Sequence, residues 1–182
     1  MNKGQSIVLR VAGIVFFMLT IATSLEMLSR AVGSWVFMIE GESSAWGVFY
    51  VLTSMLFTSF FVFAAFATGL AGIFAGKEPY TQAIWNCSSY ALTFVSVFAL
   101  LQILTGITED DASIVLVSSA SILGLIVFMV IVFFCLRKEE GFYWKNLYTL
   151  DVGTKLCFKV WGIMLVVIYV GTFIYAHKLL DA

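Results

Sequence analysis

The sequence predicts an all-α fold, a polytopic bundle of about five transmembrane helices. Hydrophobic residues make up 62% of the 182 residues, and charged residues make up only 12%. A soluble domain carries about 25% charged residues, because its surface must be compatible with water. The mean hydropathy of +1.03 also indicates a lipid environment. We therefore expect residues 1–182 to form a single integral membrane domain.

Five apolar runs are each long enough to cross a hydrocarbon core about 30 Å thick, which takes about 20 helical residues. Lipid cannot hydrogen-bond the backbone, so each run is expected to be helical. The first run follows Lys3 and includes Arg10, as in a signal peptide, but its length favours a retained membrane helix. The runs cover residues 7–28, 46–75, 80–104, 113–136 and 156–180.

The breaks between these runs are polar. Residues 40–44 separate the first run from the second, and residues 76–79 form a turn whose Pro79 suits the first turn of a helix. Residues 108–111 have the spacing of a capping box before the fourth run. Residues 137–151 form the longest polar stretch.

Basic residues favour the cytoplasmic side of a membrane, and they predict the orientation. With a cytoplasmic N-terminus and five spans, Arg30 and Lys178 are the only two of the ten basic residues that fall outside. The outer loops instead carry Glu40, Glu42 and the acidic residues 109–111. We expect a multi-pass protein of the plasma or inner membrane with its C-terminus outside.

A four-span arrangement is the alternative. In that arrangement residues 141–159 lie flat on the membrane as an interfacial amphipathic segment, and the last apolar run re-enters or docks. Aromatic residues beside Lys145, together with Trp35 and Trp46, resemble the anchors of a membrane interface.

The third run carries a polar stripe at helical spacing. In lipid such a stripe must face protein or water, so it predicts either hydrogen bonds between helices or a cavity that binds a small molecule. Serine and threonine can bond their own backbone, which leaves two amides in need of partners. The candidate ligand-binding residues are Gln82, Asn86, Ser89, Thr93 and Ser96.

Small residues on the second run predict close helix packing, either within the chain or with another chain. Gly72 and Gly76 form a GxxxG match, a common motif that lets helix backbones approach. A shorter notch lies on the fourth run. The candidate packing residues are Ala67, Thr68, Ala71, Gly72, Ala75, Gly76, Ala120 and Gly124.

Charged residues are predicted to sit at the membrane boundaries. Glu26 and Arg30 have the favourable order for an ion pair four residues apart on a helix. Asp151 and Lys155 repeat that spacing. None of these charges falls at a predicted bilayer midplane, where ion and proton carriers usually place one.

Motifs of catalysis and cofactor binding do not occur in the sequence. Cys87, Cys135 and Cys157 are far apart and are read as single buried thiols, and one histidine, His177, cannot supply a histidine-rich metal site. The run 109–111 is read as a helix cap, because consecutive acids do not converge on one calcium ion. A net charge of −1 gives no basic field for nucleic acid. We expect no enzyme activity, no cofactor, no metal and no nucleic-acid partner.

Three functions remain, in this order. The first is a non-catalytic accessory or scaffold subunit of a membrane complex, or a self-associating membrane component. The second is a small transporter, channel or solute-binding protein with a polar cavity along the third helix. The third is a membrane enzyme assembled at residues 137–151. The expected partners are the lipid bilayer and other membrane chains or further copies of this one, and a small-molecule ligand is possible under the second function.

Overall fold

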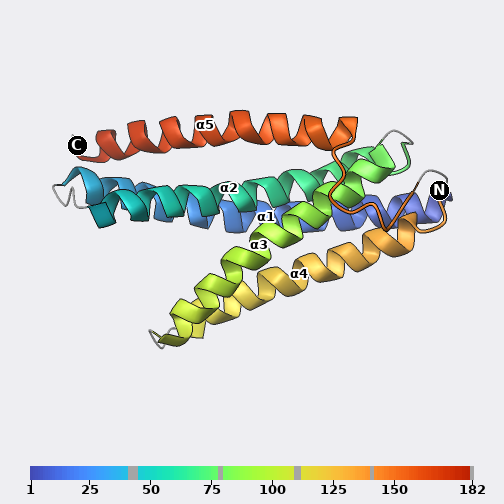
Figure 1. Ribbon diagram of the computed structural model, residues 1–182, viewed down its shortest axis with the longest axis horizontal. Helices are drawn as coiled ribbons and strands as arrows, with labels where there is room; N and C mark the ends of the chain where they lie inside the picture. The colour runs from blue at the N-terminus through green and yellow to red at the C-terminus, as the bar shows by residue number, and fades with distance from the viewer. Residues whose placement is uncertain (41–44, 78–79, 109–111, 140–141, 181–182) are drawn as a thin grey trace.

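The computed structural model describes residues 1–40, 45–77, 80–108, 112–139 and 142–180, and all regular secondary structure in these ranges is helical. Each helix is long and apolar enough to cross a membrane. The prediction of a five-helix membrane bundle is confirmed. The predictions for Pro79 and for residues 109–111 fall outside the described residues. The helices are α1 (Lys3–Ile39), α2 (Ala45–Phe74), α3 (Thr81–Thr108), α4 (Ala112–Leu136) and α5 (Val152–Leu180) (Figure 1).

Helix α1 extends beyond both ends of the apolar run that predicts it. A capping box starts it early, because Asn2 accepts a hydrogen bond from the Gln5 backbone and the Gln5 side chain accepts one from Asn2. At the other end, the Glu40 N–H still bonds the Val36 carbonyl. At 1.5 Å per residue the helix is about 55 Å long, so it must tilt or project beyond a core of about 30 Å.

Helix α5 is continuous from Val152 to Leu180. Residues 152–159, which the four-span alternative lays flat on the membrane, are its first turns. Asp151 caps the helix, because its carboxylate accepts hydrogen bonds from the Thr154 N–H at 2.8 Å and the Thr154 hydroxyl at 2.9 Å. This capping role replaces the predicted pairing of Asp151 with Lys155.

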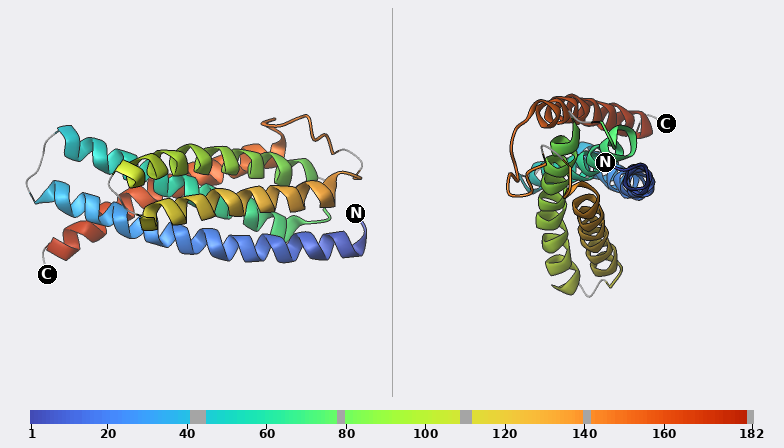
Figure 2. Two further views of the ribbon diagram at one scale, coloured as in Figure 1. Left: turned by 90° about the horizontal axis from the view of Figure 1, so that it is seen from below. Right: turned by 90° about the vertical axis from the view of Figure 1, so that its right-hand side faces the viewer.

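The helices converge at the end of the molecule where the chain begins and spread toward the opposite end. Figure 1 shows α1, α2 and α5 running side by side, with the α3–α4 hairpin diverging from them. The end-on view in Figure 2 shows α3 and α4 leaning away from α5, with α1 and α2 between. The two termini lie at opposite ends, as an odd number of spans requires.

Aromatic side chains hold α5 against α2 and α3. Trp161 donates its indole N–H to the Ser59 carbonyl at 2.7 Å, and its ring packs against Phe63 and Phe94. Further out, Trp35 is 4% exposed and packs edge-on against two aromatic rings of α5. The prediction of Trp35 as an anchor at the membrane interface is therefore wrong, because α5 covers it. The Trp46 side chain is outside the described structure.

Candidate functional site

The polar stripe of α3 lies mainly under the segment that connects α4 to α5. We call residues 142–151 the strap. Of the predicted ligand-binding residues, Asn86 and Ser89 are buried, Gln82 and Ser96 are half-buried, and Thr93 is exposed. The strap crosses the first half of α3 at the end of the bundle where the helices converge (Figure 1).

Asn86 is the centre of this contact and is fully buried. Its amide nitrogen donates to the Thr149 carbonyl at 3.0 Å, the Thr149 hydroxyl at 2.7 Å and the Asp151 carboxylate at 2.8 Å. Its amide oxygen accepts from Gln82 at 3.1 Å. The same carboxylate caps α5, so Asn86 ties α3 directly to the start of the last helix.

Gln82 fixes the beginning of the strap through the strap backbone. Its side-chain oxygen accepts from the Tyr143 N–H at 3.0 Å, and its nitrogen donates to the Asn146 carbonyl at 3.1 Å. One turn further along α3, the Trp85 indole donates to the Trp144 carbonyl at 3.3 Å. These contacts satisfy backbone groups that would otherwise lack partners beside the membrane.

The middle of the strap is held by tyrosine. The Tyr90 hydroxyl donates to the Tyr148 carbonyl at 2.7 Å, and the Tyr148 hydroxyl lies 2.8 Å from that of Thr93. Tyr148 has a φ of 61°, a left-handed conformation that a non-glycine residue adopts only when its surroundings hold it there. The strap is therefore a fixed structure with its own contacts.

Three polar side chains of the stripe are hydrogen-bonded within the chain. The amides of Gln82 and Asn86 bond the strap, and Ser89 bonds the Trp85 carbonyl on its own helix. The pockets along α1 are lined by other residues. The arrangement positions chain segments, and its one carboxylate, Asp151, already accepts from Asn86 and Thr154.

The small residues of α2 face α1. A Cβ added to Gly13 of α1 would lie 2.3 Å from the Gly72 nitrogen, so the two backbones touch at this point. Thr68 meets Thr20 at 3.4 Å between hydroxyls. Ala67, Ala71 and Ala75 are buried, while Gly76 ends the line with a φ of 85° beside Ser6.

The notch on α4 borders a different space. Ala120 and Gly124 line a crevice of about 280 Å³ between α4 and α1, at the point where the α3–α4 hairpin begins to diverge. A Cβ added to Gly124 would meet the Phe16 ring of α1 at an ordinary 3.6 Å. The notch therefore borders a space beside α1, while α4 packs against α1 further along, where the Phe16 and Phe128 ring centroids are 5.2 Å apart.

The Glu26 and Arg30 side chains form an ion pair of 2.8 Å, and each is 49% exposed. Another pair closes the converging end of the bundle, where the N-terminal amine contacts Glu139. The exposed pair of Glu26 and Arg30 contributes little to stability. Arg30 also lines a pocket together with Gly33, Ser34 and Phe37.

The three cysteines are buried and free, as expected, but two of them are neighbours. Cys87 on α3 and Cys157 on α5 lie beside each other in one buried cluster, close to Thr154. Among the described residues, no three histidine, cysteine or acidic side chains gather to hold a metal ion.

Two groups of residues were missed by sequence reasoning. Gly13 has no small residue four positions away to signal its contact with Gly72, and the strap has no periodicity that points to α3. The Asp151 to Thr154 spacing of a helix cap could have located the start of α5. A comparison of the chain with protein-family models, curated proteins and solved structures finds no match.

Proposed function

We propose that this protein is a non-catalytic subunit of a membrane complex and that it binds its partner through the outer face of α5. We define this face by Ile163, Val166, Val170 and Ile174, which recur at three- and four-residue spacing and are all about half exposed or more. The partner surface would be transmembrane helices of another chain or of a second copy.

The exposure of α5 is the observation that carries this proposal. In the most apolar 18-residue window of α5, 11% of the residues are buried, against 50% in α2. The helix is attached along the side that faces α1, α2 and α3, through Trp161 and through the two rings that cover Trp35. Short connections leave the helix faces as the main surface with which a partner could interact.

The strap supports the proposal by fixing where α5 starts. The hydrogen bonds of Asn86 and Asp151 anchor its first turn, so its outer face is presented in one orientation to the bilayer. We propose the predicted orientation, with the N-terminus cytoplasmic. The rise from Arg10 to Arg30 along α1 is about 30 Å, the thickness of a hydrocarbon core, so both charges can reach an interface.

Site-specific photo-cross-linking in native membranes tests the proposal. A benzoylphenylalanine placed at Val166 or Val170 should give an adduct with one discrete partner of fixed mass. The matched control is the same group at Leu123 of α4, which is similarly exposed but lies on the diverging hairpin. Adducts with many chains, or equal adducts from α4, would contradict the proposal.

The alternative function, binding or transport of a solute along α3, requires the strap to move away from α3. The polar side chains of α3 would then become free to contact a ligand. Asn86→Leu would abolish ligand flux or binding in that case. If the protein is a subunit instead, the same substitution should weaken cross-linking through α5, because Asn86 helps to anchor the start of that helix. A loss of ligand binding with unchanged cross-linking would therefore favour the alternative function.

A further inference from the structure

Two neighbouring hollows meet at Gly33 of α1. The larger, of about 800 Å³, runs between α1 and α5. The smaller, of about 570 Å³, lies beside Arg30, Gly33, Ser34 and Phe37. A Cβ added to Gly33 would have no heavy atom within 4 Å. Gly33 therefore lines both hollows without a side chain between them.

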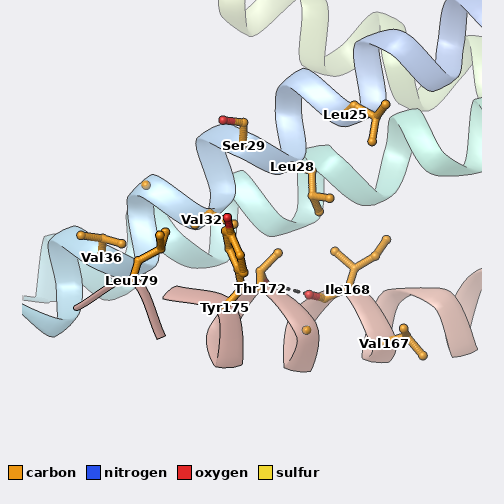
Figure 3. Close-up of a pocket in the computed structure, with 12 residues that line it drawn as sticks. Leu25, Leu28, Ser29, Val32, Val36, Val167, Ile168, Thr172, Tyr175 and Leu179 are labelled. Atoms are coloured by element: carbon orange, nitrogen blue, oxygen red, sulfur yellow. Dashed lines mark hydrogen bonds between the residues drawn. The ribbon is translucent and has the colours of Figure 1, made fainter. Parts of the chain in front are cut away.

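The larger hollow, which we call the α1–α5 groove, suits a hydrocarbon chain. Its twelve lining residues include no charged side chain. The Thr172 hydroxyl already donates to the Ile168 carbonyl at 2.7 Å, so its proton is engaged within α5. Figure 3 shows Tyr175 reaching from α5 toward α1 beside Val32, and it shows Leu28 on α1 directed toward α5.

The length and lining of the groove suit an acyl chain. From Leu25 to Val36 the groove follows α1 for about 17 Å, and Arg30 lies beside its middle.

Arg30 supplies a cation beside the groove. Its side chain is 49% exposed, and one terminal nitrogen contacts Glu26. A guanidinium has five N–H donors in a fork that matches the oxygens of a phosphate. Arg30 also lies at a suitable depth in the membrane. It is about 30 Å along α1 from Arg10, so if Arg10 is at one membrane interface, Arg30 is near the other, where lipid phosphates are.

We propose that this is a binding site for a phosphate-bearing lipid, with one acyl chain in the α1–α5 groove and the phosphate on Arg30. Gly33 is the crossing point between the two. The site lies on the side of α5 that faces α1, so it is separate from the outer face of α5. The inference therefore does not rest on the proposed partner.

Photo-labelling with defined lipids tests the site in the full-length protein, reconstituted into phosphatidylcholine vesicles. One probe is phosphatidic acid with a diazirine in an acyl chain, and the other is diacylglycerol with the same chain. The phosphatidic acid probe should label peptides that contain residues 25–36 and 167–179. It should label them in excess over the exposed apolar residues of α4.

Two variants separate the groove from the cation. Gly33→Leu should abolish groove labelling by both probes, and the matched control Gly162→Leu, another glycine in open surroundings, should not. Arg30→Gln should lower labelling by phosphatidic acid about tenfold, the effect of one lost charge-assisted hydrogen bond. Arg30→Gln should leave labelling by diacylglycerol unchanged. The control Lys159→Gln should leave labelling by both probes unchanged.

Three results would overturn the site. Labelling spread evenly over α4 and α5 would show ordinary surrounding lipid. Groove labelling that survives both Gly33→Leu and Arg30→Gln would show that these residues do not form it. A cross-link between two copies of the chain through residues 25–36 would assign the groove to self-association.

Discussion

The contact between Gly13 and Gly72 makes Gly13→Ala the sharpest single test of the packing. The added methyl group would lie 2.3 Å from the Gly72 nitrogen and 2.9 Å from the Ala71 carbonyl carbon. Ordinary contact begins at 3.4 Å, so α1 and α2 must separate by about 1 Å. Backbone atoms cannot turn aside as a flexible side chain can. Overpacking of this kind costs about 1–3 kcal/mol.

Thermal unfolding in detergent, followed by tryptophan fluorescence, measures this effect. A loss of about 2 kcal/mol corresponds to a fall in Tm of roughly 4–8 °C for a chain of this size. The control is Gly162→Ala, because a Cβ at Gly162 meets nothing within 4 Å. Alanine also favours a helix over glycine by about 1 kcal/mol, so the control should be as stable as the wild type or more so. If both variants unfold at the same temperature, the close approach of α1 and α2 is refuted.

Three further predictions follow from the contacts. Asn86→Leu should release the strap and raise its cleavage by chymotrypsin, about tenfold for each 1.4 kcal/mol lost; unchanged cleavage would contradict the role of Asn86. Gly76→Ala should lower the Tm by roughly 2–8 °C, because a φ of 85° costs alanine about 1–2 kcal/mol; a Tm equal to that of the wild type would contradict the turn geometry. Mild oxidation should join Cys87 to Cys157 within one chain and leave Cys135 free, as peptide mapping without reductant can establish; recovery of both thiols unjoined would contradict their contact.

The apolar runs predicted the helices well because length and hydropathy decide whether a segment is stable in lipid. The ends of the helices were less predictable. Helix α1 starts early through the Asn2 and Gln5 capping box and continues past the charged pair Glu26 and Arg30. Such ends depend on a few hydrogen bonds, which an apolar pattern does not record.

The stripe on α3 was visible from its spacing, but its partner was not. Gln82 and Asn86 required hydrogen bonds, and the sequence left open whether another helix or a small-molecule ligand would provide them. The strap provides them through backbone carbonyls at Asn146 and Thr149. Backbone groups carry no side-chain signature, so this pairing could not be read from residue types.

The link between Asn86 and Asp151 also sets an order of assembly during synthesis. The Asn86 amide enters the membrane with α3, but its partners Thr149 and Asp151 are made 63 and 65 residues later. At 5–20 residues per second the wait is about 3–13 s. During that time the amide must form temporary hydrogen bonds with water or with the insertion machinery, since lipid offers none. The strap therefore completes the hydrogen bonding of the third helix just before the last helix is made.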